Sequence, residues 1–228
     1  EVLLLGASRG AVDDLARAIS LERGATFGLH RLSFTQLAAR LGIVRVVPTD
    51  AIREVMRGLF SRELMPTLYT SSFDADSALR EPPPQPADKV IVGFREQTSA
   101  VAVGVRSLIE RAAMEGTSAI IEGAHLVPGF IDTDSFADQV LAVPLVVTVE
   151  DEELHRSHFV ARTADSATRP LDRYLNGFNK IRKVQKYIKS QALARDWPVV
   201  SSYNLDQTIA SAIELVVEAA MERTGTAS

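Results

Sequence analysis

The chain has 228 residues, of which 46% are hydrophobic and 24% charged, and it contains no cysteine. This length and composition fit a globular protein with one large domain, or one domain plus a small appendage, and the lack of cysteine excludes a disulfide framework, a thiolate metal site and a thiol nucleophile. Because the net charge is −4, the longest clean apolar stretch (Leu141 to Val149) is short and no signal peptide is evident, we predict a soluble, cytoplasmic protein that binds neither nucleic acid nor membrane.

Five short apolar runs predict strands at about residues 2–5, 44–49, 118–122, 145–150 and 198–203. They are rich in β-branched residues and do not alternate with polar ones, which is typical of strands buried on both faces of a parallel sheet. Helical periodicity lies between them, over residues 93–115 and 209–221. This alternation predicts a doubly wound α/β sheet, in which ligands bind beyond the carboxyl ends of the strands. The residues that follow the runs are therefore the first candidates for chemistry: Asp50, Glu122, Asp151 and Asn204.

The segment Thr49–Arg57 combines a carboxylate with two arginines. Arg53 and Arg57 lie three and seven residues after Asp50, so all three share one helical face. The arginines can hydrogen-bond in pairs to a carboxylate or phosphate, and Asp50 can accept a hydroxyl proton, so this is a candidate pocket for a small anion. The structural alternative is that Asp50 caps the helix by accepting hydrogen bonds from its first N–H groups.

The apolar run Ile120–Ile121 ends in Glu122, and His125 follows three residues later. An acid at the end of an apolar strand is the Walker-B pattern, in which the acid holds Mg²⁺ or its water, although acids are common at strand ends. We predict that His125 is a hydrogen-bonded loop or core histidine rather than a general base.

Two stretches interrupt the alternation of strands and helices. The proline-rich residues 81–86 predict a stiff surface loop. Residues 152–194 contain no predicted strand, and they are helical and rich in cations. Most of residues 180–189 are expected to be a solvated surface. By contrast, Arg162 and Arg169 flank a turn-prone stretch, which indicates a mobile flap able to cover a triphosphate.

A phosphate-binding loop is not found. The pattern G-x-x-x-x-G-K-[ST] is absent: no Gly-Lys-Ser comes after Gly6–Gly10, and the segment Gly24–Arg31 has His30 where the lysine would be. Ser33–Gln36 is a capping box, which can start a helix through Leu41 without any nucleotide.

Four strings, at residues 46–57, 93–97, 120–129 and 181–188, together resemble the 2-phosphoglycerate kinase family. The resemblance covers roughly residues 34–217. It implies a P-loop kinase that transfers the γ-phosphoryl group of ATP to the hydroxyl of 2-phosphoglycerate and gives 2,3-bisphosphoglycerate. It further implies a P-loop-kinase-like domain over residues 34–228 with a helical lid at about 152–194. Residues 1–33 would then hold the first strand and phosphate loop, or the remnant of an N-terminal regulatory domain.

The resemblance also implies roles for single residues. Asp50 would accept the hydroxyl proton, Glu122 would hold Mg²⁺ through water, and Arg162 would reach the transferring charge from the lid. The acceptor would be bound by Arg53, Arg57, Arg95 and His125, and the nucleotide by Arg156, Arg169, Asn204 and Asp206.

The chain departs from the family at the lysine of the phosphate loop and at the Ser/Thr beside it. Either a segment with this loop is missing between Gly6 and Phe34, or the protein is a degenerate relative that binds a nucleotide or metabolite without phosphorylating it. A kinase for another small hydroxy acid and a structural partner protein stay open, because fold does not determine function. A homo-oligomer is compatible with the sequence.

Overall fold

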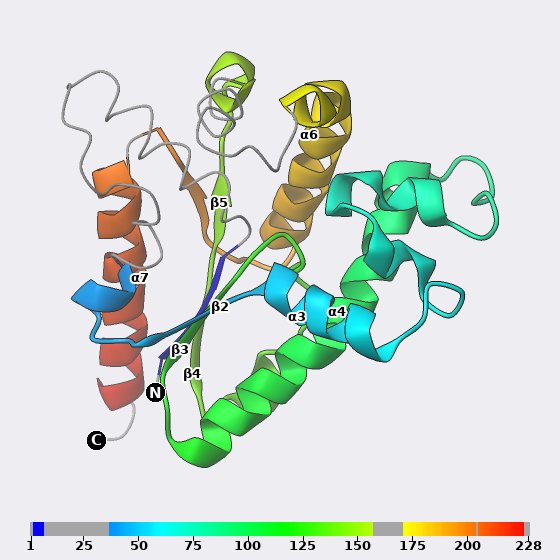
Figure 1. Cartoon of the computed structure of the whole chain (residues 1–228). Coiled ribbons are helices and arrows are strands. Elements are labelled where there is room, and N and C mark those ends of the chain that lie inside the picture. The colour runs from blue at the N-terminus through cyan, green and yellow to red at the C-terminus, as the bar shows by residue number, and fades with distance from the viewer. Residues whose placement is uncertain (1, 7–36, 157–170, 204, 226–228) are drawn as a thin grey trace.

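The computed structural model describes residues 2–6, 37–156, 171–203 and 205–225. These residues form short parallel sheets flanked by helices (Figure 1). The elements in chain order are β1 (Val2–Gly6), β2 (Arg45–Pro48), α3 (Thr49–Leu59), the 3₁₀ helices η1 (Pro66–Tyr69) and η2 (Ser72–Ala78), α4 (Lys89–Glu115), β3 (Ala119–Glu122), the 3₁₀ helix η3 (Asp134–Phe136), β4 (Leu141–Pro144), β5 (Val146–Thr148), α6 (Leu171–Leu193), β6 (Val199–Ser201) and α7 (Leu205–Gly225).

The larger sheet has the strand order β2-β3-β1-β4, and β5 pairs with β6 in a second sheet. Every pairing among these strands is parallel, as the sequence predicts. Strands occur at all five predicted runs, and residues 81–86 form a loop. The predicted helices also form, and α4 and α7 extend beyond the predicted ends. Of the predicted helix through Leu41, residues 37–40 are described and are helical.

The predicted strand at residues 145–150 differs most from the structure. An extended segment begins already at Leu141, where β4 pairs with β1, and β5 then pairs with β6. Pro144 has no backbone N–H with which to continue the ladder to β1. The next pairing starts where the Val146 N–H donates to the carbonyl of Pro198 at 2.8 Å. The chain therefore changes its neighbouring strand at Leu145.

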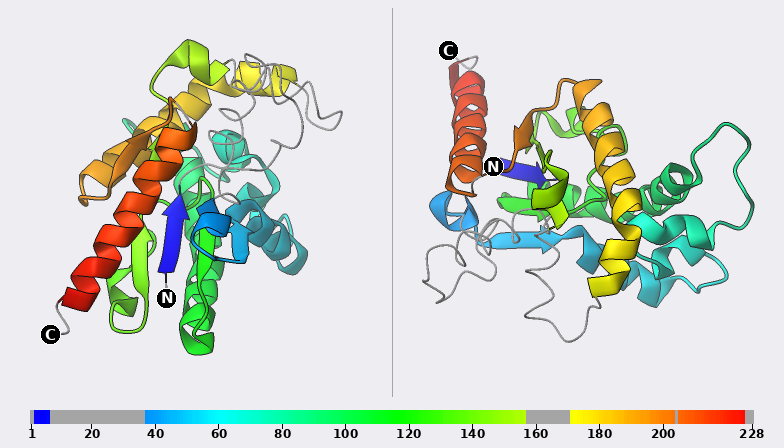
Figure 2. Two further views of the ribbon diagram at one scale, coloured as in Figure 1. Left: turned by 90° about the vertical axis from the view of Figure 1, so that its left-hand side faces the viewer. Right: turned by 90° about the horizontal axis from the view of Figure 1, so that it is seen from above.

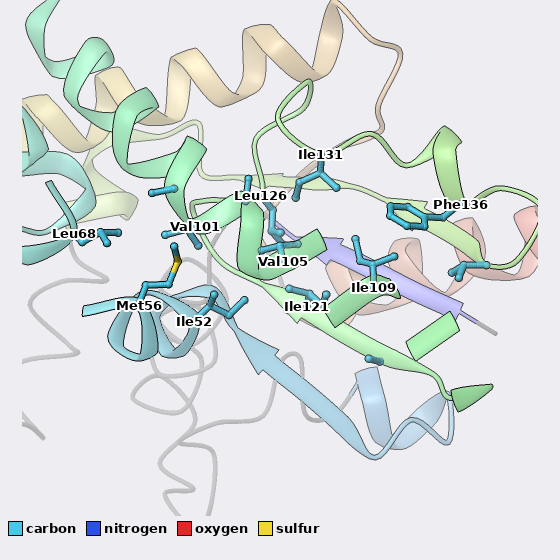
Figure 3. Packing of buried hydrophobic residues seen from close by; sticks show 14 residues of the cluster. Ile52, Met56, Leu68, Val101, Val105, Ile109, Ile121, Leu126, Ile131 and Phe136 are labelled. Atoms are coloured by element: carbon cyan, nitrogen blue, oxygen red, sulfur yellow. The ribbon is translucent and has the colours of Figure 1, made fainter. Parts of the chain in front are cut away.

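Helices cover both faces of the larger sheet, with α7 on one side and α4 on the other (Figures 1 and 2). The side chains of β3 alternate between these layers. Ile121 packs in the cluster formed with α3 and α4 (Figure 3). Ile120 packs in the cluster that includes α7. The strand β3 thus has an apolar layer on each face, as a strand buried on both faces requires. Among the described helices, none has the length and apolar character needed to cross a membrane.

The helix α6 docks on η2 and on the exit of β5. Lys180 lies 2.8 Å from a carboxylate oxygen of Asp74 and 2.7 Å from one of Asp76. Arg182 is 11% exposed and donates to the carbonyls of Val149 at 2.6 Å and Glu150 at 2.9 Å. The expectation of a solvated surface is correct for the exposed Lys183 and Lys186, but it is wrong for Arg182, because this side chain ties the helix to the strand.

Candidate functional site

The carboxyl ends of three neighbouring strands lie in one row. Glu122, the last residue of β3, is in register with Pro48 of β2 and with Gly6 of β1. The helix α3 begins directly after β2 (Figure 1). Asp50, its second residue, therefore lies beside this row. The family resemblance implies a phosphate loop after Gly6, and that segment lies outside the described residues. The structure therefore brings Asp50 and Glu122 to one edge, as the sequence predicts.

Asp50 lies in the first turn of α3 and is 65% exposed. The residue before the helix is Pro48, and no side chain makes a capping hydrogen bond there, so the interpretation of Asp50 as a cap is wrong. Its carboxylate instead lies 3.5 Å from the Nε of Arg53. The carboxylate of Asp50 is therefore open to solvent, beside a guanidinium and near the positive end of a helix.

The two arginines of α3 both contact Glu54, since Nη2 of Arg53 donates to its Oε1 at 3.3 Å, but their other partners differ. Arg53 is 15% exposed and its Nη1 donates to the carbonyls of Thr70 at 2.5 Å and Leu68 at 3.3 Å. Arg57 donates to both carboxylate oxygens of Glu54 at 2.7 Å, and its guanidinium lies 5.0 Å from the centre of the Tyr69 ring. Arg53 thus accompanies Asp50, whereas Arg57 is engaged one turn further along the helix.

His125 is 1% exposed and both of its ring nitrogens are hydrogen-bonded within the protein. Nδ1 lies 3.0 Å from Oγ1 of Thr49, and Nε2 lies 2.9 Å from Oε1 of Gln97. Burial lowers the pKa of His125 from 6.5 to about 4, while the charge of Asp50 raises it and that of Arg53 lowers it. The ring is thus neutral at physiological pH. The sequence analysis predicts a hydrogen-bonded loop or core histidine, and His125 is one. Its contact with a substrate stays a prediction.

Glu122 is buried at the end of β3. The next residue, Gly123, has φ of +140°, and a Cβ there would overlap Oγ1 of Thr49, so only glycine allows β3 and α3 to approach this closely. The donor chemistry at Glu122 fits Mg²⁺, which is bound by one or two carboxylates together with substrate phosphates. Among the described residues, no group of three or more histidines, cysteines or acids could hold a metal ion.

The other predicted site residues are spread over α4, the segment after β5 and the start of α7, or lie outside the described part. Arg95 is exposed on α4 with its guanidinium 5.9 Å from the Phe130 ring, and Arg156 stacks over Phe178 at 3.9 Å. Asp206 is exposed in the first turn of α7. Asp151 caps the helical turn after it, because its carboxylate accepts from the Leu154 N–H at 2.7 Å. The remaining three predictions lie outside the described residues: Arg162, Arg169 and Asn204.

Sequence reasoning did not single out Thr49 or Gln97. Both are buried polar residues at the centre of the hydrogen bonds around His125. A signal for Gln97 exists, because it falls on the face of α4 that also carries the buried Phe94 and Val101. A polar residue on such an apolar face needs an internal partner.

No family model matches the sequence. Proteins named 2-phosphoglycerate kinase do: that of Methanothermobacter thermautotrophicus is 44% identical over 188 residues, which are 82% of this chain and 61% of that protein. That of Methanocaldococcus jannaschii is 40% identical over 191 residues, 84% of this chain and 60% of that protein. That of Pyrococcus furiosus is 40% identical over 188 residues, with 82% and 60% covered. The chain thus spans about three fifths of the length of these relatives. It is a homologue of the archaeal 2-phosphoglycerate kinases.

Proposed function

We propose that this protein is an ATP-dependent kinase with a P-loop-kinase fold, and that it phosphorylates the hydroxyl of 2-phosphoglycerate to give 2,3-bisphosphoglycerate and ADP. The observation that carries the proposal is the placement of Asp50, Arg53 and Glu122 at one sheet edge in a chain 38–44% identical to proteins named for this reaction. Residues 34–228 would be the kinase domain, with a lid at about 152–194.

Asp50 has the chemistry for the acceptor side of this reaction. A bond forms between the hydroxyl oxygen of the acceptor and the γ-phosphorus, and the bond from that phosphorus to the bridging oxygen of ADP breaks. The hydroxyl proton passes to the carboxylate of Asp50. Arg53 lies 3.5 Å from that carboxylate and bears a charge that complements the anionic groups of the acceptor. Arg57 and Arg95 are the further candidates for these groups.

Glu122 would hold Mg²⁺ through water, and the ion would neutralise charge on the phosphates. Glu122 is in register with Gly6, so it lies beside the exit of β1, where the family resemblance implies the phosphate loop. The nucleotide would be bound by four residues named from the sequence: Arg156, Arg169, Asn204 and Asp206. Arg162 would reach the transferring charge from the lid.

A second candidate function is a nucleotide or metabolite sensor without catalysis. One observation favours it, namely the absence of the Gly-Lys-Ser/Thr sequence that binds the transferred phosphate in P-loop enzymes. A sensor would be stabilised by its ligand, because a ligand that binds only the folded protein raises its stability.

The experiment that separates the two functions measures ADP release and Tm together. ATP and Mg²⁺ are supplied with 2-phosphoglycerate, 3-phosphoglycerate or glycerate. The kinase proposal predicts ADP release that depends on 2-phosphoglycerate and is weaker with the other two acids. A rise in Tm with ligand but no acceptor-dependent ADP release would contradict the kinase and support the sensor.

A further inference from the structure

A buried chain of polar side chains connects the start of α3 with the residues around η1. It runs from Oγ1 of Thr49 to Nδ1 of His125 at 3.0 Å, and from Nε2 of His125 to Oε1 of Gln97 at 2.9 Å. The Nε2 of Gln97 then donates to the carbonyls of Thr67 at 2.5 Å and Thr70 at 3.1 Å. All three side chains are buried.

The carbonyls of Thr67 and Thr70 determine the direction of every hydrogen bond in this series of side chains. A backbone carbonyl only accepts, so the amide nitrogen of Gln97 must face Thr67 and Thr70, and the amide oxygen must face His125. Nε2 of His125 therefore carries the hydrogen, and in the neutral ring Nδ1 is the acceptor. The hydroxyl of Thr49 must then be a donor.

The series of hydrogen bonds returns to α3 through Arg53. The carbonyl of Thr70 that accepts from Gln97 also accepts from Nη1 of Arg53 at 2.5 Å. Since Thr49 and Arg53 are in the first turns of the same helix, the hydrogen bonds form a closed ring that passes through α3, the loop after β3, α4 and the end of η1. Asp50 and Arg53 are held on this ring, on the side of the candidate acceptor pocket.

We propose, on the basis of the function proposed above, that Thr49, His125 and Gln97 are positioning residues that hold the Arg53 guanidinium in place for the anionic group of the acceptor. Their effect passes through the Thr70 carbonyl and the first turn of α3. A polar ring whose members are all hydrogen-bonded is rigid, because each member restricts the geometry of the next. The close approach of Gly123 to Thr49 adds to this restriction, since it leaves the Thr49 hydroxyl no room on that side.

Thr49→Val and Thr49→Ser are the matched variants that test the proposal. Valine keeps the shape of threonine but removes the donor to Nδ1, whereas serine keeps the donor. With valine, Nδ1 of His125 has no partner in either tautomer, because valine neither donates nor accepts, and the hydrogen bonds that restrain His125, Gln97 and the Thr70 carbonyl lose their anchor on α3. We expect the KM for 2-phosphoglycerate to rise about tenfold or more with valine, the cost of leaving a buried acceptor unpaired, with the KM for ATP little changed. Serine should restore the wild-type KM.

Nitrogen NMR of the imidazole supplies a readout that purely structural damage would not produce. In the wild-type protein the signals should show hydrogen on Nε2 and none on Nδ1, and valine should shift the Nδ1 signal because the hydrogen-bond donor to Nδ1 is gone. The reverse tautomer in the wild type would overturn the proposal, even if the valine variant failed to fold.

Two kinetic results would also overturn the positioning role. One is an unchanged KM for 2-phosphoglycerate in a folded Thr49→Val variant, and the other is an equal rise of the KM for both substrates. Failure of the proposed function would look different, because the wild-type protein would then neither bind nor phosphorylate 2-phosphoglycerate. That result would remove the acceptor-side role before any variant is compared.

Discussion

Replacing Asp50 with asparagine separates a proton acceptor from a structural residue. The side chain is 65% exposed, makes no capping hydrogen bond, and pairs with Arg53 at 3.5 Å. An exposed pair of this kind contributes at most about 1 kcal/mol to the free energy of unfolding. For a chain of this size, that loss lowers the Tm by only about 2–4 °C. The Asp50→Asn variant should therefore remain folded.

Turnover should fall much further than stability. A positioned proton acceptor contributes about 10²- to 10⁴-fold to kcat. Phosphoryl transfer through a loose transition state depends more on positioning than on proton removal, so we expect a loss near the lower bound, about 10²-fold. Binding of 2-phosphoglycerate should survive or become tighter, because Arg53 keeps its bonds to the Thr70 carbonyl and a negative charge leaves the pocket.

The assay measures kcat, the KM for 2-phosphoglycerate and the Tm on wild type, Asp50→Asn and Glu110→Gln. Glu110 is a matched control, because this half-exposed carboxylate also pairs with an arginine, Arg106, at 3.7 Å. It lies on the half of α4 that leads to the amino end of β3, away from the candidate site. Near-normal turnover of Asp50→Asn would refute the reasoning, as would an equal loss in Glu110→Gln.

Two substitutions and one titration test the packing around the site. Gly123→Ala should lower the free energy of unfolding in urea by at least about 1–3 kcal/mol, since its backbone has φ of +140° and the new Cβ would overlap Thr49. Lys180→Met should cost about 1–3 kcal/mol in the same assay, because it removes a partner of Asp76, which is 2% exposed. Burial lowers the pKa of His125 to about 4 from 6.5, so the unfolded chain binds the extra proton between these values. The free energy of unfolding should thus fall as the pH drops from 6.5 to 4, by up to about 1.4 kcal/mol per pH unit, with no contribution from this group above 6.5.

Each of these outcomes has a control in the chain. Gly58→Ala is the control for Gly123, because nothing lies within 4 Å of its Cβ position, and equal tolerance of both changes would contradict the close approach. Lys183→Met is the control for Lys180, because Lys183 makes a more exposed pair with Asp88 at 2.7 Å. An NMR titration that gives His125 an ordinary pKa near 6.5 would contradict the buried neutral ring.

The strands and their order along the chain could be predicted because buried parallel strands require continuous apolar runs, as in Ala119–Glu122. The meeting of Asp50 and Glu122 could be predicted for a related reason, since the carboxyl ends of parallel strands share one edge. These inferences need only local patterns and one general rule of topology.

The partners of single side chains could not be predicted in the same way. Arg57 shares a helical face with Asp50 in the sequence pattern, but in the structure it pairs with Glu54 and lies over the Tyr69 ring. The bonds of His125 to Thr49 and Gln97 join residues 76 and 28 positions apart, which no local pattern reveals. The burial of Arg182 likewise depends on where α6 docks against the exit of β5.

The most direct test of the kinase proposal is a phosphorus NMR spectrum of the protein with ATP, Mg²⁺ and 2-phosphoglycerate, followed over time. We predict that the γ-phosphate signal of ATP declines while the signals of ADP and of the two phosphates of 2,3-bisphosphoglycerate grow in equal amounts. Loss of the γ-phosphate signal to free phosphate, or a spectrum that does not change while 2-phosphoglycerate is present, would contradict phosphoryl transfer to this acceptor.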